Sequence, residues 1–207
     1  DFFYRSVDGK VAGKIKVGVL NLQGAVSEHV AALTKCGAEV IRVKYLEQLA
    51  DLEALVIPGG ESTTIGSLID RFNLGPALKE FIRSGRAVYG TCAGMILLAN
   101  KIDGPAQYSL GGMDITVKRN AFGRQRESFE VDLDIPVLGK KPFRGIFIRA
   151  PQIIQCGAKV KTLATYHNQA VAAQQGKLLV SAFHPELTED IRMHAYFLQL
   201  AGKNRSG

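Results

Sequence analysis

The chain contains the stretch Val88-Tyr89-Gly90-Thr91-Cys92-Ala93-Gly94-Met95-Ile96-Leu97-Leu98, in which two apolar runs flank a cysteine set between glycines. The first run predicts a buried strand, and the second, with helical spacing, predicts a helix. A sharp strand-to-helix turn with a reactive residue at its apex is a nucleophile elbow, and here Cys92 would be the nucleophile. The alternative is a plain buried junction, because small residues around a cysteine are common in protein cores.

The residues next to Cys92 fit such an elbow. Gly90 and Gly94 leave space where the helix packs back on the strand, which a Cβ atom would obstruct. The cysteine would lie beside free N–H groups at a helix N-terminus, an environment that favours the thiolate. The N–H of Ala93 is one expected donor to an oxyanion, and the backbone of Gly60 in Pro58-Gly59-Gly60 is the second. An ordinary Pro-Gly turn is the alternative for that motif.

Length and composition are those of an ordinary globular protein. The 207 residues are 46% hydrophobic and 22% charged, which predicts a single domain. No apolar run reaches the roughly 20 residues of a membrane helix, so no membrane association is expected. The three cysteines, Cys36, Cys92 and Cys156, are an odd number at unrelated spacing. That argues against a disulfide framework or a metal site and favours a reducing compartment, the cytoplasm. We interpret Cys36 and Cys156 as structural and expect no metal and no cofactor.

The formal net charge of +7 raises the question of nucleic-acid binding. Basic residues are mostly dispersed, apart from Lys118, Arg119, Arg124 and Arg126 in one short segment. Because no basic stripe is interleaved with aromatic residues, we expect no nucleic-acid partner. We expect residues 1–14 to be an N-terminal extension or a remnant, 15–202 to form one domain, and 203–207 to be a C-terminal tail.

Strand, turn and helix patterns alternate through the first hundred residues. They predict strands at 16–20, 39–43, 54–57 and 86–90, and helices at 26–36, after 63 up to 71, at 76–83 and at 93–99. Such alternation is typical of right-handed βαβ units and a mainly parallel sheet, an α/β fold. Later patterns predict shorter strands with hairpin connections at 115–117, 129–133, 146–148, 171–173 and 178–180, and a closing helix at 190–200.

Four unusual turns follow predicted strands. They are Asn21–Gly24, Pro58–Thr63, Gly90–Gly94 and Phe183–Glu186. In open parallel sheets, functional groups gather at the carboxyl ends of the strands. We therefore expect these four turns to meet at one edge of the sheet.

The turn Phe183-His184-Pro185-Glu186 supplies a candidate base for Cys92. In an extended segment His184 and Glu186 point the same way. A carboxylate beside an imidazole selects its tautomer and stabilises the imidazolium, which in turn holds a thiolate. Alone, the motif would be an ordinary strand-ending turn. His29 and His194 lie in helical patterns and are interpreted as surface or packing residues, and His167 as a turn residue.

Together these motifs resemble the class I glutamine amidotransferases, and within them the glutaminases that serve pyridoxal 5′-phosphate synthesis. The resemblance runs from about Lys16 to Leu200. It is carried by Asn21–His29, Pro58–Thr64, Gly90–Gly94, Arg119–Gln125, Phe147–Pro151 and Phe183–Asp190. It implies a flavodoxin-like three-layer sandwich around a mainly parallel sheet. Asn21 departs from the pattern, because glycine is more usual there.

The resemblance also implies roles for individual residues. Cys92 is the nucleophile, His184 the acid and base, and Glu186 the partner that orients His184. The glutamine pocket is formed by Gly59, Gly60, Glu61, Arg119, Ile148 and Arg149. Because free glutamine carries an ammonium and a carboxylate, a selective pocket needs an acid and a guanidinium, and Glu61 and Arg119 are of those types.

The implied reaction is hydrolysis of L-glutamine to L-glutamate and ammonia through a glutamyl thioester on Cys92. The ammonia would pass to a separate barrel-shaped synthase subunit, in a large heteromeric complex that makes pyridoxal 5′-phosphate (vitamin B6).

Two other hypotheses remain at this point. The first is another cysteine hydrolase on the same fold, either a peptidase or an amidotransferase of another pathway. Glu61, Arg119 and Arg149 argue against a peptidase, which does not need a pocket matched to a free amino acid. The second is a non-catalytic binding module with a basic surface, against which the intact set of Cys92, His184 and Glu186 argues.

Overall fold

The computed structural model of the protein describes residues 13–119 and 128–202. The predicted tail at 203–207, most of the predicted extension at 1–14, and the basic residues Arg124 and Arg126 lie outside the described residues. Within the described ranges, no helix is long and apolar enough to cross a membrane.

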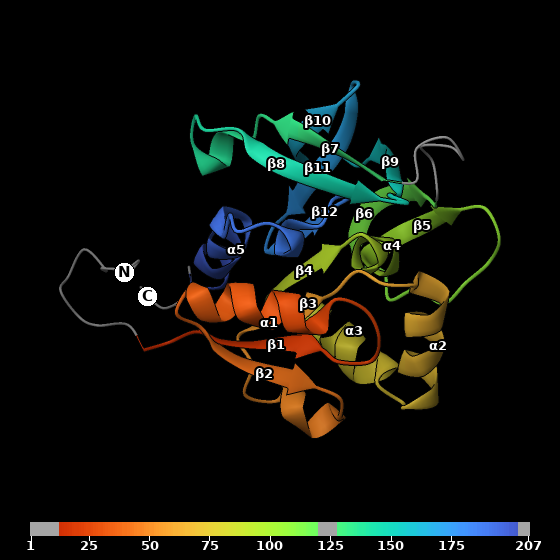
Figure 1. Ribbon diagram of the computed structural model, residues 1–207. Helices are drawn as coiled ribbons and strands as arrows, with labels where there is room; N and C mark the ends of the chain where they lie inside the picture. The colour runs from red at the N-terminus through yellow and green to blue at the C-terminus, as the bar shows by residue number, and fades with distance from the viewer. Residues whose placement is uncertain (1–12, 120–127, 203–207) are drawn as a thin grey trace.

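The centre of the molecule is a seven-stranded sheet with the order β10-β11-β12-β4-β3-β1-β2 (Figure 1). Five neighbouring strands are parallel: β12 (Leu178–Ser181), β4 (Ala87–Thr91), β3 (Ala54–Ile57), β1 (Lys16–Leu20) and β2 (Glu39–Val43). Two strands, β10 (Lys161–Tyr166) and β11 (Gln169–Gln175), continue the sheet in antiparallel fashion. Strands β3 and β4 are buried along their whole length, as expected for central strands covered on both faces. The predicted mainly parallel α/β sheet is confirmed.

Helices cover both faces of this sheet. Helix α1 (Val26–Lys35) and helix α5 (Arg192–Gly202) contact each other and lie together over one face (Figure 1). Helices α2 (Ser62–Arg71) and α3 (Gly75–Arg83) connect β3 to β4, in the opposite direction along the sheet from the β1-to-β2 connection. Because such connections are right-handed, α2 and α3 lie on the other face, where α4 (Ala93–Leu98) packs against α2. The three layers agree with the predicted sandwich.

The second half of the chain adds two smaller sheets. Strands β5 (Ala99–Asp103), β6 (Met113–Lys118) and β9 (Gln152–Cys156) form one, and β7 (Ser128–Leu133) and β8 (Phe143–Ile148) form the other. Short 3-10 turns lie at η1 (Leu46–Leu49), η2 (Pro136–Leu138) and η3 (Pro185–Leu187).

The structure corrects several sequence predictions in this half. Strands β5, β9 and β10 were not predicted, and β12 runs parallel beside β4 in the main sheet as well as forming a hairpin with β11. The closing helix begins at Arg192 and not at Asp190, and the Asp190 carboxylate accepts the N–H of Arg192 (3.1 Å), the first residue of the helix. The strand before Cys92 includes Thr91, and α4 ends at Leu98 because Ala99 begins β5.

The glycines around Cys92 allow α4 to lie directly on the sheet. A Cβ atom on Gly94 would lie 2.0 Å from the carbonyl oxygen of Ile57 in β3, and one on Gly90 would lie 2.5 Å from the carbonyl oxygen of Gly94. No side chain fits at either position, as the sequence pattern indicates. The close approach brings the first turn of α4 against the end of β3.

Aromatic side chains hold the β7–β8 pair onto the main sheet. The Phe147 ring in β8 stacks on Phe129 of β7 (4.7 Å between centroids) and meets Phe183 edge-on at 5.8 Å. Such pairs contribute about 1 kcal/mol each beyond the area they bury. The N–H of His184 also donates to the carbonyl oxygen of Ile146 (2.8 Å). These contacts bring the end of β8 beside the turn that carries His184.

Candidate active site

The four predicted turns meet around one cavity of about 370 Å³ at the carboxyl ends of the parallel strands. Its lining includes every residue predicted for catalysis, glutamine binding or the oxyanion. The lining residues are Gln23, Gly24, Ala25, Gly59, Gly60, Glu61, Ser62, Cys92, Ala93, Ile96, Arg119, Ile148, Arg149, His184, Glu186 and Leu187. The prediction that these segments share one sheet edge is confirmed.

Cys92 lies at the apex of the turn between β4 and α4. Its backbone is in the left-handed region (φ 51°, ψ −105°), which costs a residue with a side chain about 1–3 kcal/mol. The turn is held from both sides, because the Cys92 N–H donates to the Ser181 carbonyl (2.8 Å) and the Cys92 carbonyl accepts from Ile96 (3.2 Å). The side chain is buried, and Sγ lies 4.0 Å from the carbonyl oxygen of Ile148. The strand-to-helix elbow predicted from the sequence is therefore present, with its thiol facing the cavity.

His184 lies between the thiol and a buried carboxylate. Its Nδ1 is 2.6 Å from Glu186 Oε1, and Cys92 lines the same cavity. Burial lowers the pKa of His184, but the hydrogen bonds with Cys92 and Glu186 outweigh burial and raise that pKa to about 10. Since the Glu186 side chain is fully buried, its charge acts on the imidazole with little screening by water. The arrangement favours an imidazolium at His184 at neutral pH.

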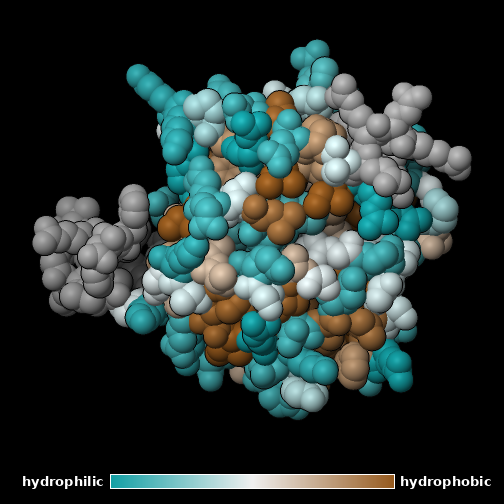
Figure 2. All heavy atoms as spheres, viewed as in Figure 1, coloured by the Kyte–Doolittle hydropathy of each residue, from teal (hydrophilic) through white to brown (hydrophobic). Residues whose placement is uncertain are grey.

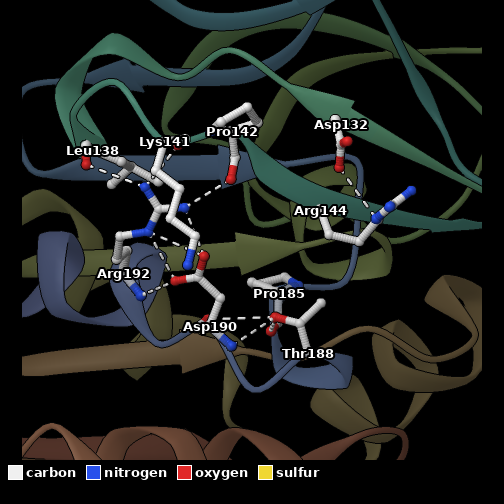
Figure 3. Close-up of polar contacts among 9 residues, drawn as sticks. All are labelled: Asp132, Leu138, Lys141, Pro142, Arg144, Pro185, Thr188, Asp190 and Arg192. Carbon is white, nitrogen blue, oxygen red and sulfur yellow. Dashed lines mark hydrogen bonds and ion pairs between the residues drawn. The ribbon is translucent and has the colours of Figure 1, made fainter.

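The segment after the His184 turn is tied to the β7–β8 side of the molecule by Arg192 (Figure 3). The guanidinium of Arg192 donates to the carbonyl oxygens of Lys141 (2.8 Å) and Pro142 (3.0 Å) and pairs with the Asp190 carboxylate (2.7 Å). Thr188 closes the turn itself, donating from its hydroxyl to the Pro185 carbonyl (3.0 Å). These bonds fix the chain on the C-terminal side of Glu186.

Gly59 and Gly60 approach the site with their backbone. A Cβ atom on Gly59 would lie 2.6 Å from Cε1 of His184, so the peptide chain itself forms the wall of the cavity there. The Gly59 carbonyl accepts the N–H of Ala25 (3.0 Å). Because the peptide is planar and trans, the N–H of Gly60 points in the opposite direction, away from Ala25. The Ala93 N–H belongs to the first residue of α4, where helical N–H groups have no partner inside the helix.

Glu61 caps helix α2 at the edge of the cavity. Its Oε2 accepts the backbone N–H of Thr64 (3.0 Å) and the hydroxyls of Thr63 and Thr64. The bond from Thr63 is the main reason why the pKa of Glu61 is lowered. The Glu61 N–H in turn donates to Oε1 of Gln23 (2.8 Å), which packs against Gly60. No sequence motif singles out Gln23, although the turn that contains it was predicted to lie at this edge.

The remaining predicted pocket residues come from the second half of the chain. Arg119 follows β6, and Ile148 and Arg149 lie at the end of β8, where Arg149 has a positive φ of 42°. Asn120, which follows Arg119, is outside the described residues. Asn21, the departure from the family pattern, donates its N–H to the Val43 carbonyl (2.7 Å) at the end of β1.

Two histidines that were interpreted as surface or packing residues are fully buried behind this cavity. His29 in α1 and His194 in α5 have no exposed area, and His29 Nδ1 lies 2.8 Å from His194 Nε2. His29 Nε2 also lies 3.1 Å from Thr91 Oγ1. The surface alternative is therefore wrong. The spacing of His29 three residues after Val26, on the apolar face of the helix, was the available signal.

The buried histidines predict that the protein loses stability in acid. Burial lowers the pKa of His194 to about 4 and also lowers the pKa of His29. In the unfolded chain histidine titrates near 6.5, so between pH 6.5 and 4 the unfolded state binds more protons, and stability decreases as the pH is lowered. Above pH 6.5 these histidines are neutral in both states, so they no longer lower the free energy of unfolding. His194 alone accounts for about 3 kcal/mol at pH 4.

Urea unfolding of the wild type and of His194→Gln, measured from pH 7.5 to pH 4, tests this expectation. The variant should show a shallower fall in the free energy of unfolding across the window. His167→Gln is the matched control, because His167 is exposed and should leave the slope unchanged. A His194→Gln variant with the wild-type slope contradicts the explanation.

Comparison with known proteins relates this geometry to one family. The model of the SNO glutamine amidotransferase family matches residues 19–203. The chain is 59% identical over 196 residues to "Pyridoxal 5'-phosphate synthase subunit PdxT" of Pelotomaculum thermopropionicum, covering 93% of this chain and all of that protein. It is 56% identical to the protein of the same name from Niallia circulans, covering 92% of this chain and all of that one. A solved structure described as "Crystal structure of glutamine amidotransferase" matches with a TM-score of 0.86 and 49% identity, covering 90% of this chain and 98% of the other.

Proposed function

Because this chain belongs to the SNO glutamine amidotransferase family, we propose that it is the glutaminase subunit of a pyridoxal 5′-phosphate synthase. It hydrolyses the side-chain amide of L-glutamine to L-glutamate and ammonia, and the ammonia serves pyridoxal 5′-phosphate synthesis. The observation that carries the proposal is the meeting of Cys92, His184 and Glu186 in one cavity at the sheet edge.

The reaction begins with the pair formed by Cys92 and His184. The thiolate attacks the amide carbon of glutamine, and the tetrahedral intermediate carries its negative charge on oxygen. The Ala93 N–H at the start of α4 and the N–H of Gly60 are the proposed donors to that oxygen. The support for Ala93 is its place directly after the nucleophile at a helix N-terminus, and for Gly60 its place in the cavity wall.

His184 carries the proton in both halves of the reaction. The imidazolium donates its proton to the amide nitrogen, the carbon–nitrogen bond breaks, and ammonia leaves a glutamyl thioester on Cys92. The neutral imidazole then removes a proton from water, which attacks the thioester and releases glutamate and the thiolate. Glu186 stabilises each imidazolium state through the 2.6 Å contact with Nδ1.

The polar ends of glutamine are recognised away from the thiol in this proposal. Glu61 is ionised, because its pKa is lowered, and a carboxylate of this kind suits an α-ammonium group. Arg119 and Arg149, which line the same cavity, suit an α-carboxylate. Gly59, Gly60 and Ile148 complete the wall around the side chain of the substrate.

The synthase subunit is the proposed partner, in a heteromeric complex. Its contact surface would include Leu187, which lines the cavity and is 42% exposed. Figure 2 shows hydrophobic side chains on the surface between β8 and α1. Exposed apolar surface of this kind is typical of a subunit contact.

We also propose that residues 15–202 form a single amidotransferase domain and that the protein acts in the cytoplasm. The support for one domain is a buried hydrophobic cluster that extends from β1 to α5. The support for the cytoplasm is that Cys36, Cys92 and Cys156 are all free thiols.

Glutamine turnover with and without the synthase subunit tests the function. We expect glutamate and ammonia in equal amounts, with a rate that rises when the synthase subunit is added. A glutamine-like electrophile should label Cys92, whereas a peptide electrophile should not, which separates this function from that of a peptidase. Absence of glutamine hydrolysis in the presence of the synthase subunit contradicts the proposal.

A further inference from the structure

A chain of buried polar side chains extends from the catalytic pair into the core. His184 contacts Glu186 Oε1, the other oxygen of that carboxylate, Oε2, lies 3.5 Å from His29 Nε2, and His29 contacts His194. This series of side chains extends from η3 through α1 to α5. None of it is needed for packing alone, because an apolar side chain would fill the same space without a desolvation cost.

The carboxylate is only half satisfied in the described structure. Oε1 receives the His184 bond, but among the described residues Oε2 is buried without a hydrogen-bond partner. A buried carboxylate oxygen without a donor is costly, and each such atom in a native protein calls for an explanation. His29 Nε2 faces this oxygen at 3.5 Å.

The protonation of His29 follows from its neighbours. Its lowered pKa, caused by burial and by the nearby His194 and His184, makes it neutral, so one ring nitrogen carries a hydrogen and the other does not. A lone pair on Nε2 would face the Glu186 carboxylate and be repelled, whereas an N–H would be attracted. Nε2 is therefore the protonated nitrogen, and it lies 3.1 Å from Thr91 Oγ1 and 3.5 Å from Glu186 Oε2.

His194 matches this tautomer. If His29 Nδ1 carries the lone pair, it accepts the N–H of His194 Nε2 across 2.8 Å. His194 Nδ1 is then an unprotonated acceptor, and it is the other buried side-chain atom among the described residues that has no partner. An acceptor left unpaired is tolerated more readily than a donor. The N–H groups of His184, His29 and His194 in this series are then all directed toward the Glu186 carboxylate.

We propose that His29 is a positioning residue for Glu186: the Nε2–H of His29 attracts the second carboxylate oxygen at 3.5 Å, while the first oxygen binds His184. The inference rests on the proposed function. The N–H fixes the rotation of the carboxylate, so that Oε1 stays aligned with His184 Nδ1 when the imidazolium forms and disappears. His194 selects the His29 tautomer that makes this contact.

Three substitutions of His29 separate this role from packing. The amide nitrogen of Gln reaches the place of Nε2, and that of Asn reaches only the place of Nδ1, so His29→Gln keeps a donor toward Glu186 and His29→Asn does not. His29→Leu removes both polar contacts. Each variant is assayed for glutamine hydrolysis in complex with the synthase subunit, and its thermal unfolding is measured in parallel.

We expect kcat to fall about tenfold or more in His29→Asn and His29→Leu, with KM for glutamine within about twofold of wild type. His29→Gln should stay within about threefold in kcat. In a Glu186→Gln background, His29→Leu should cause no further loss of kcat, because the two residues act as a unit.

Three outcomes overturn the inference: a folded His29→Leu with wild-type kcat, a loss in His29→Gln equal to that in His29→Asn, or losses of kcat that follow the thermal stability of the variants. The wild-type complex in the same assay keeps the two proposals apart. If it does not hydrolyse glutamine, the proposed function fails; if it does and His29 variants match it, only the role of His29 fails.

Discussion

Replacing Cys92 by alanine is expected to lower kcat for glutamine hydrolysis by about 10⁴-fold or more, to the level of the uncatalysed background in a coupled glutamate assay. The reason is that no other group in the cavity can form the thioester, and without it the difficult amide cleavage is not divided into two easier steps. Intact-mass analysis after treatment with a glutamine-like electrophile should show one adduct on the wild type and none on Cys92→Ala.

The other two cysteines provide matched controls. Cys36 and Cys156 lie away from the cavity lining, and burial raises the pKa of both thiols, that of Cys36 to about 11. Cys36→Ala and Cys156→Ala should therefore keep both turnover and labelling. If Cys92→Ala kept full glutamine hydrolysis, the assignment of the site would be wrong.

Replacing Glu186 by glutamine is expected to lower kcat about 10³-fold while leaving the protein folded. Glutamine has nearly the shape of glutamate but no charge, so the His184 imidazolium loses the partner 2.6 Å from its Nδ1. Its amide can also donate to Nδ1 and hold the wrong tautomer, and in a comparable protease triad this change costs about 10⁴-fold. Steady-state kinetics with the synthase subunit present measures the loss.

Stability distinguishes this effect from a structural one. Glu186→Gln loses the pairing with the His184 imidazolium, but it also removes the desolvation cost of a fully buried carboxylate, and His184 can then release its proton. Because these effects oppose each other, we expect the urea midpoint of Glu186→Gln to change little. Glu189→Gln is the control, because the Glu189 side chain is 94% exposed and pairs only at the surface with Lys35. A Glu186→Gln variant that loses activity and stability together would indicate a packing role instead.

The strands of the parallel core could be predicted from the sequence because each is marked by a short run of neighbouring residues. Apolar runs of four or five residues, each followed by glycine-rich turns, predict β1, β3 and β4, and the pair Gly90 and Gly94 predicts the tight contact of α4. The strands β5, β9 and β10 escaped prediction. Their burial is mixed, and they are stabilised by pairing with distant strands and not by their own composition.

The candidate site was likewise predicted in part, through the residues that lie in recognisable turns. Cys92, His184 and Glu61 lie in turns that follow strands, and their residue types are typical of catalytic or binding sites. They were therefore predicted to lie at one edge of the sheet. Gln23 and His29 carried no such signal. Gln23 matters through the N–H of Glu61, and His29 through Glu186, and both contacts join residues far apart in the chain.

The chain's local chemistry was thus enough to predict an α/β sheet, a reactive cysteine at an elbow, and a histidine–carboxylate pair to serve it, because strand, turn and nucleophile motifs are properties of neighbouring residues. Folding alone decided which way each of these groups faces. The 2.6 Å contact of His184 with Glu186, the raised pKa of His184, and the approach of His29 to the second carboxylate oxygen all depend on removal from water. Burial and orientation are created when distant elements pack together, and no stretch of sequence contains them by itself.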